Sequence, residues 1–199
     1  MFTFINLSWE AIGFIALIIR LAASFEKDDR KLFLLLATCS FFYGIHFFGL
    51  GLFTASFINF FDVTKNLVAL KFKKNLYVFF FYIISYTIIG GLTSHGHIIP
   101  FMFVIGSMIS IYAAFFLKGI YLRLCYLITN LLYLSYSIYG GSIAGSVSSI
   151  LFSISLSFSI YILFKRKGFI GKIKYYNSLA YKKVVKFFEI KKLKIKMIK

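Results

Sequence analysis

The sequence predicts an all-α integral membrane protein with seven transmembrane helices, and three observations lead to this prediction. The 199 residues are 60% hydrophobic and only 15% charged, with a mean hydropathy of +0.87, whereas soluble domains are closer to 25% charged. The apolar residues gather in seven segments of about 20 residues each, the length at which a helix crosses a bilayer. Connections that contain Lys or Arg alternate with connections that contain neither.

The seven apolar segments are separated by glycines or polar residues. We expect helices, because a sheet edge cannot satisfy its backbone groups in lipid and the alternation of a membrane β-barrel is missing. No basic region precedes the first segment and no small-residue cleavage site follows it, so we expect a membrane helix and not a signal peptide. The expected bounds are Leu7–Phe25, Lys31–Leu50, Leu52–Leu70, Leu76–Leu92, Ile98–Leu117, Ile120–Ile138 and Ser142–Phe164.

The connections predict the orientation of the helices. Glu26–Lys31, Lys71–Asn75 and the pair Lys118/Arg123 carry Lys or Arg, and the connections between them, at 49–51, 93–97 and 139–142, carry none. Basic connections stay in the cytoplasm. The sequence therefore predicts an outer N-terminus and a cytoplasmic C-terminus, and six or eight helices would break the alternation.

The first and last three helices form an internal repeat. Arg20–Phe33 aligns with Ile111–Cys125 with one residue inserted, and Phe42–Asn59 aligns with the segment around Leu134–Ser149. An odd linking helix gives the two units the same orientation, as in parallel-repeat transporters. The predicted organisation is a first repeat at 1–70, a linker helix at 71–97, a second repeat at 98–164 and a basic cytoplasmic tail at 165–199.

Several motifs resemble a known family. They are "WEAIGFIALI" from Trp9, "GIHFFGLGLFTASFIN" with "KNL" from Lys65, Pro100 at the start of the fifth helix, and "RLCYLITNLLYLSYSIYGGSIAG" from Arg123. On these residues the chain resembles the YgjV family of bacterial inner membrane proteins, over most of its length up to Lys167. The resemblance implies a multi-pass protein of the bacterial inner (cytoplasmic) membrane and implies no particular activity.

The layout of three, one and three helices is also similar to SWEET/PQ-loop and PnuC-type transporters. The Pro-Gln pair of the former is missing, because Pro100 is the only proline and Phe101 follows it. The tryptophan-rich pattern of the latter is missing too, because Trp9 is the only tryptophan. The resemblance therefore implies neither a sugar nor nicotinamide riboside as substrate.

Polar residues in the third helix are the first candidates for a site. Asn59 and Asp62 lie near its middle, and the spacings Asp62/Lys65 and Asn59/Asn66 place these side chains on one face. One interpretation is an internal Asp–Lys pair with interhelical hydrogen bonds that hold the bundle together. The other is the wall of a cavity, because ionisable residues inside membranes face such interiors. The sequence leaves both open.

The repeat adds candidates in the second half. Ser149 matches Asn59, and Asn130 lies near the middle of the sixth helix, so both would meet the third helix where the repeats join. His46 is expected either to bond a neighbouring helix or to take part in function. The substrate-pathway candidates are Asn59, Asp62, Asn130, Ser149 and His46. By contrast, we expect Arg20 to extend to the cytoplasmic surface and Glu10 to be solvated.

The C-terminal tail holds thirteen of the 23 Lys and Arg residues and one acid, Glu189. Its apolar residues recur at helical spacing, which predicts an amphipathic helix on the anionic inner leaflet. A solvated tail is the alternative, and no nucleic-acid-binding motif is present. The residues expected at anionic lipids are Lys165, Arg166, Lys167, Lys172, Lys174, Lys182, Lys183 and Lys186.

Two classes of function remain after these observations. The sequence shows no catalytic set, metal cluster or phosphate-binding loop, so we expect no enzyme, cofactor or metal. Cys39 and Cys125 share no motif spacing and are expected to be packed thiols. The layout and the central polar residues favour a small-solute transporter with the bilayer around it. The alternative is a membrane scaffold or partner-binding protein that transports nothing.

Overall fold

The computed structural model describes residues 4–94 and 98–165, which form seven α-helices and, in these ranges, no strand. The chain divides into a unit that ends at Ile160 and a unit that begins at Tyr161, of which residues 161–165 are described. The predicted helices are confirmed in number and order. They are α1 (Phe4–Phe25), α2 (Asp29–Gly49), α3 (Phe53–Lys71), α4 (Leu76–Thr93), α5 (Ile98–Phe116), α6 (Gly119–Tyr139) and the seventh helix, Ile143–Lys165.

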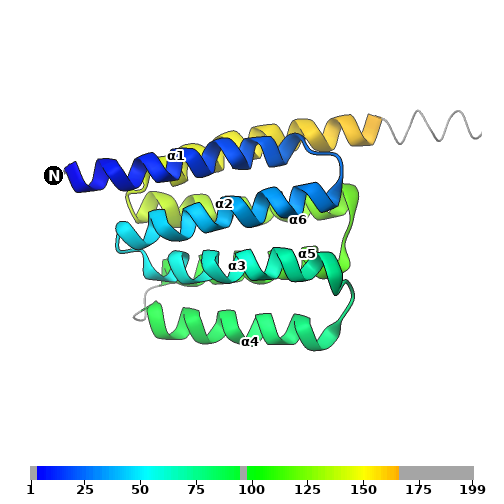
Figure 1. The fold of residues 1–199 in the computed structure, drawn as a ribbon, viewed down its shortest axis with the longest axis horizontal. Helices are drawn as coiled ribbons and strands as arrows, with labels where there is room; N and C mark the ends of the chain where they lie inside the picture. The colour runs from blue at the N-terminus through cyan, green and yellow to red at the C-terminus, as the bar shows by residue number, and fades with distance from the viewer. Residues whose placement is uncertain (1–3, 95–97, 166–199) are drawn as a thin grey trace, which may run out of the picture. The chain divides into compact units, whose positions relative to one another are not determined.

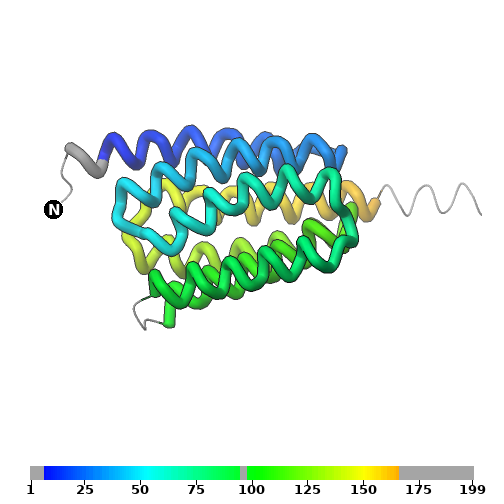
Figure 2. The backbone as a smooth tube through the Cα atoms, turned by 60° about the horizontal axis from the view of Figure 1, so that its bottom comes forward, coloured from blue at the N-terminus to red at the C-terminus, as the bar shows by residue number. Residues whose placement is uncertain are grey.

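The helices of the first unit form two layers. In Figure 1, α1, α2 and α3 follow one another from top to bottom, and the seventh helix, α6 and α5 lie behind them in that order. The fourth helix, α4, packs against α3 and α5 at the bottom of this view. Successive helices run in opposite directions, so the turns at 50–52 and 140–142 share one end of the bundle, as Figure 2 also shows.

The ends of several helices follow from local chemistry. Asp28 caps α2 by accepting the Arg30 N–H, and Asn75 caps α4 by accepting the Tyr77 and Val78 N–H groups. Gly51 and Gly141 have positive φ angles of 75° and 66°, which glycine adopts without strain. These two glycines therefore permit the tight turns after α2 and α6.

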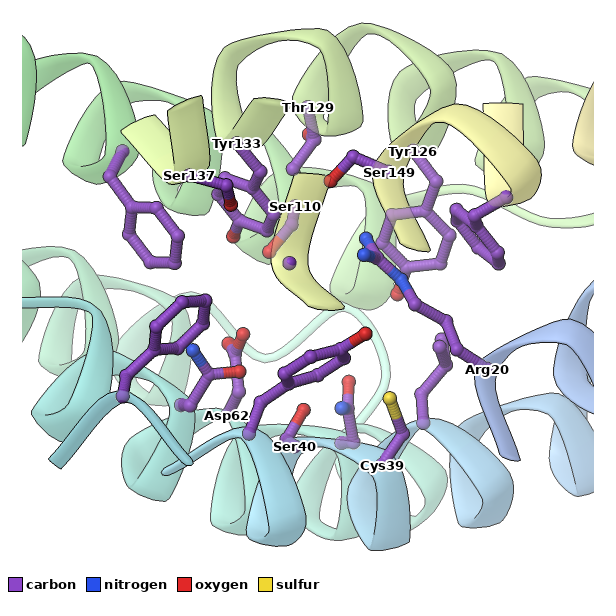
Figure 3. Close-up of a pocket in the computed structure, with 18 of the residues that line it drawn as sticks. Arg20, Cys39, Ser40, Asp62, Ser110, Tyr126, Thr129, Tyr133, Ser137 and Ser149 are labelled. Atoms are coloured by element: carbon purple, nitrogen blue, oxygen red, sulfur yellow. The ribbon is translucent and has the colours of Figure 1, made fainter. Parts of the chain in front are cut away.

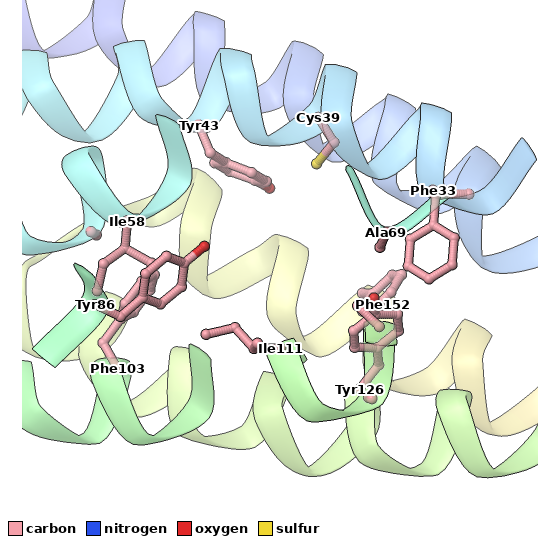
Figure 4. Close-up of a cluster of buried hydrophobic side chains, with 14 of the residues drawn as sticks. Phe33, Cys39, Tyr43, Ile58, Ala69, Tyr86, Phe103, Ile111, Tyr126 and Phe152 are labelled. Atoms are coloured by element: carbon pink, nitrogen blue, oxygen red, sulfur yellow. The ribbon is translucent and has the colours of Figure 1, made fainter. Parts of the chain in front are cut away.

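The core consists of aromatic and small side chains contributed by both layers (Figure 4). Phe103 of α5 stacks on Tyr133 of α6, with ring centroids 4.1 Å apart. On the outside, α4 exposes large apolar side chains, such as Tyr77 at 90% and Leu92 at 75%. Soluble monomers rarely expose apolar faces of this size, so the outer surface is suited to lipid.

Five helices are long and apolar enough to cross a membrane, and α3 and α6 are not among them. The reason is the polar content of these two helices: α3 contains Asp62, Lys65 and Asn66, and α6 contains Arg123 and Asn130. All five side chains are buried inside the protein. The seven transmembrane helices that the sequence predicts are therefore matched by seven helices, of which five qualify as membrane spans by length and composition.

Candidate functional site

A cavity lies between the two layers, and Figure 3 shows side chains that reach it from both. It is lined by residues of α1, α2, α3, α5, α6 and the seventh helix, whereas no described residue of α4 lines it. The cavity leaves about 70 Å³ for the centres of water molecules. This is room for about five to seven waters, or for a solute of similar size.

One side of the cavity is formed by a buried ion pair. Lys65 Nζ lies 2.5 Å from Asp62 Oδ1, and it also donates to Ser110 Oγ at 2.8 Å. Tyr86 of α4 donates its hydroxyl to the same Asp62 oxygen at 2.6 Å. Asn59 lies one turn away and donates to its own helix at the Ala55 carbonyl. The predicted Asp–Lys pair is present, and it lies at the wall of a cavity, so the two interpretations of α3 are compatible.

Arg20 lines the opposite part of the cavity, which corrects the expectation that it reaches the membrane surface. Its guanidinium donates to Asn130 Oδ1 at 2.7 Å and to Ser148 Oγ at 3.4 Å, and it lies 4.4 Å from the centre of the Phe152 ring. Among the described residues, neither ion pair involves Arg20. Arg20 turns inward because polar groups of α6 and the seventh helix solvate it there.

Two buried polar atoms of lining residues have no hydrogen-bond partner in the described part of the chain. They are the Tyr126 hydroxyl and Asn66 Oδ1, and each side chain is at least nine-tenths buried. Buried polar groups are nearly always hydrogen-bonded. The unpaired atoms therefore add hydrogen-bonding groups to a lining that also contains apolar side chains.

The lining residues of the two halves correspond to one another. Seven pairs, each separated by 90 positions, line the cavity together: Arg20/Ser110, Leu36/Tyr126, Cys39/Thr129, Tyr43/Tyr133, Phe47/Ser137, Asn59/Ser149 and Asp62/Phe152. Residues of α1–α3 and residues of α5, α6 and the seventh helix thus line the same space at one shared spacing. The charged residues of the lining, Arg20, Asp62 and Lys65, all belong to the first half.

Contacts between the halves close one end of the bundle. We call this the Glu10 end: Glu10 Oε1 and Oε2 accept the N–H groups of Ile143 and Ala144 at 3.0 and 2.7 Å, at the start of the seventh helix. His46 bridges the Trp9 carbonyl and Ser142 Oγ, both at 2.8 Å. Glu10 is 4% exposed, so the expectation of a solvated side chain was wrong, because the helix N-terminus binds the carboxylate.

A second set of contacts closes the opposite end, which we call the Asp29 end. Arg123 Nη1 donates to Asp29 Oδ1 at 3.0 Å, and Nη2 donates to the Glu26 carbonyl at 2.8 Å. Gly119 N–H donates to Asp29 Oδ2 at 3.1 Å. The Glu26 carboxylate accepts the Asp28 and Lys27 N–H groups, and the Asp28 bond chiefly lowers the pKa of Glu26. The contacts hold the start of α2 against the start of α6.

The predicted pathway residues divide into two groups. Asn59, Asp62 and Ser149 line the cavity. Asn130 lies behind Arg20, because its amide donates to the Ser149 carbonyl and to Ser153 Oγ at 2.6 Å each. His46 is fully buried at the Glu10 end. Lys165 is exposed, and the other tail residues predicted to bind lipid lie outside the described residues.

Sequence reasoning missed Arg20, Tyr43 and Tyr126 as cavity residues. Tyrosines are frequent in this chain, and a lone Arg near a helix end usually extends to the surface. The spacing of 90 positions that separates Arg20 from Ser110 also separates Asn59 from Ser149, and it could have drawn attention to Arg20. Within the ranges that the structure describes, no group of three or more His, Cys, Asp or Glu side chains could hold a metal ion. Cys39 and Cys125 are free thiols, not a disulfide.

The chain is similar to proteins of one family. The family model Imp-YgjV, described as a bacterial inner membrane protein, matches residues 7–167. The chain is 28% identical over 138 residues to the inner membrane protein YgjV of Escherichia coli (strain K12), which covers 69% of this chain and 74% of that protein. No solved structure matches the chain.

Proposed function

Because the chain belongs to the Imp-YgjV family of bacterial inner membrane proteins, we propose that it carries a small polar solute across the inner membrane. The solute site is the cavity between the two layers. The single observation that supports this proposal most is a space large enough for several waters whose lining residues include Arg20, the Asp62–Lys65 pair and two side chains, Tyr126 and Asn66, with an unpartnered polar atom.

The proposed carrier consists of two parallel three-helix repeats, α1–α3 and α5 to the seventh helix, with α4 as the linker. A constant spacing of 90 residues supports this organisation. It relates the starts of α2 and α6 (Asp29 and Gly119) and the starts of α3 and the seventh helix (Phe53 and Ile143). This register matches Asn59 with Ser149, as the sequence predicts, but matches Arg20 with Ser110 and needs no inserted residue.

The turns after α2 and α6 support the same register. The bonds Leu52 N–H to Phe47 O and Gly51 N–H to Phe48 O recur as Ser142 N–H to Ser137 O and Gly141 N–H to Ile138 O. A two-fold axis parallel to the helices would superpose α1 on α5, α2 on α6 and α3 on the seventh helix, consistent with the order of the layers in Figure 1. Parallel-repeat transporters bind substrate where such repeats meet.

In the proposed transport cycle, the two halves rock about the cavity and expose it to one side at a time. In this cycle the contacts between the halves at the Glu10 end and at the Asp29 end would break in turn. The basic connections lie at the Asp29 end, so this end faces the cytoplasm under the positive-inside rule. Opening that end requires separation of Arg123 from Asp29.

The experiment that tests the proposal measures whether water reaches the cavity. In a protein with Cys39 and Cys125 replaced by Ser, single cysteines are placed at Asn59 and Ser149, the matched lining pair, and treated with membrane-impermeant thiol reagents from each side. The control position is Ala114, which is fully buried and does not line the cavity. We expect labelling at 59 and 149 and none at 114.

The alternative function, a scaffold or partner-binding protein, gives a different result. A bundle that never opens leaves cysteines at 59 and 149 as unreactive as one at 114, while an exposed loop position such as Lys27 still reacts. That outcome would overturn the transport proposal.

A further inference from the structure

We propose that the cavity binds a small monocarboxylate that carries a hydroxyl group, with Arg20 as the residue that holds the carboxylate. This inference rests on the proposed function, because it takes the same cavity as the solute site and names the chemical class of the solute.

The charge of the cavity wall favours an anionic solute. Three charged side chains line it, and two of these, Asp62 and Lys65, neutralise each other as a contact pair. Arg20 contacts the neutral groups Asn130 and Ser148 and the rings of Tyr43 and Phe152, and in the described part of the chain no carboxylate pairs with it. The cavity wall therefore has one uncompensated positive charge, which an anionic solute would neutralise.

Arg20 is held in place by contacts with other helices. The Asn130 amide group donates to the Ser149 carbonyl and to Ser153, which forces its Oδ1 toward Arg20. Arg20 is thus positioned by α6 and the seventh helix before any solute arrives. The planar guanidinium can bind both oxygens of a carboxylate in such a fixed position.

Other lining residues have hydrogen-bonding groups that no described residue uses. The hydroxyl of Tyr126 is free to donate, and Figure 3 shows Arg20 and Tyr126 directed toward the same part of the cavity from the two layers. Asn66 Oδ1, on α3, is an acceptor without a donor in the described part of the chain. Together these atoms fit a solute with an anionic group and a separate hydroxyl donor.

The size of the cavity suits a small solute. Space for about five to seven waters admits an acid with a short carbon chain. A small hydroxy acid satisfies the positive charge, the Tyr126 donor and the Asn66 acceptor within this space.

Equilibrium binding of radiolabelled lactate to the full-length protein in lipid nanodiscs tests this inference. We expect saturable binding that lactamide, the neutral isostere of lactate, does not displace. Arg20→Gln should weaken lactate binding by about ten- to a hundredfold, the effect of losing a hydrogen-bonded charge. Arg30→Gln, which removes the same charge from an exposed position, should leave binding unchanged.

Several results would overturn the inference: no lactate binding, displacement by lactamide or by chloride as readily as by lactate, or full binding by Arg20→Gln. If Arg20→Gln does not fold, two other measurements test the inference. The first is the comparison of lactate with lactamide on the unaltered protein, and the second is lactate binding by Tyr126→Phe, which should be weaker. The binding measurement needs no solute gradient, so it does not depend on transport. Lactate binding without a water-accessible pathway would contradict the proposed function alone. A water-accessible cavity that does not bind lactate would contradict this inference alone.

Discussion

At the residue scale, each buried charge has a specific reason to be there. Arg123 is 1% exposed, yet it binds the Asp29 carboxylate and two backbone carbonyls. Glu10 binds two N–H groups at the start of the seventh helix. A charge inside a membrane protein is costly unless such partners replace its hydration. Each of these buried charged side chains therefore requires contact between the helix that carries it and the helix or loop that supplies its partners.

The Asp62–Lys65 pair gives the first prediction. Asp62→Asn leaves Lys65, which is 2% exposed, as an uncompensated buried charge, and should lower the free energy of unfolding by about 3–5 kcal/mol. Lys65→Met should destabilise the protein similarly, whereas the double variant should lose less than the sum of the two. Unfolding of the detergent-solubilised protein measures all three. Strictly additive losses would mean that the pair does not act as a unit.

Close packing at Gly13 gives the second prediction. A Cβ atom at this position would lie 2.7 Å from Ala144 Cβ and 2.8 Å from the His46 ring. Gly13→Ala should therefore destabilise the protein by about 1–3 kcal/mol. Gly91→Ala is the matched control, because a Cβ atom there meets nothing within 4 Å, and it should be neutral or stabilising by about 0.5–1 kcal/mol. Equal melting temperatures for the two variants would contradict the packing.

At the scale of the elements, the sequence was sufficient for the helices but not for their contacts. Apolar length and glycine turns predict all seven helices, since bilayer thickness and backbone hydrogen bonding leave few other solutions. The partners of Arg20 and Glu10 could not be predicted, because each lies more than 100 residues away along the chain. Only the packing of helices decides whether a polar side chain near a helix end turns inward or outward.

The same limit applies to the candidate site. Asn59, Asp62 and Ser149 were predictable from polarity and from the repeat, and all three line the cavity. Asn130 was placed at the correct depth, but its side chain supports Arg20 instead of facing the cavity. Tyr43 and Tyr126 carry no signal in the sequence that separates them from tyrosines in contact with lipid. Only the packing of the helices shows that both line the cavity and that the Tyr126 hydroxyl has no partner among the described residues.

At the scale of the whole molecule, the proposed orientation gives a third prediction. Single cysteines are introduced at Lys27, near the Asp29 end, and at Gly51, near the Glu10 end, both of which are exposed. In intact spheroplasts of a strain that makes the protein, an impermeant thiol reagent should label position 51 and should reach position 27 only after permeabilisation. Labelling in the reverse order would invert the proposed topology and would place the basic connections outside.

The central claim is that the two halves move against each other around the cavity. Spin-label pairs at Lys27/Lys118 and at Phe48/Ile138 report the separation of the halves at the Asp29 end and the Glu10 end, and all four positions are exposed. Pulsed dipolar spectroscopy in lipid then compares the protein with Asp29→Asn and Glu10→Gln variants, each of which weakens one closure.

Asp29→Asn should add a longer distance for Lys27/Lys118 alone, and Glu10→Gln should add one for Phe48/Ile138 alone. Two results would contradict two halves that rock about a central solute site. One is a variant in which both distances increase together, and the other is that neither distance changes in either variant.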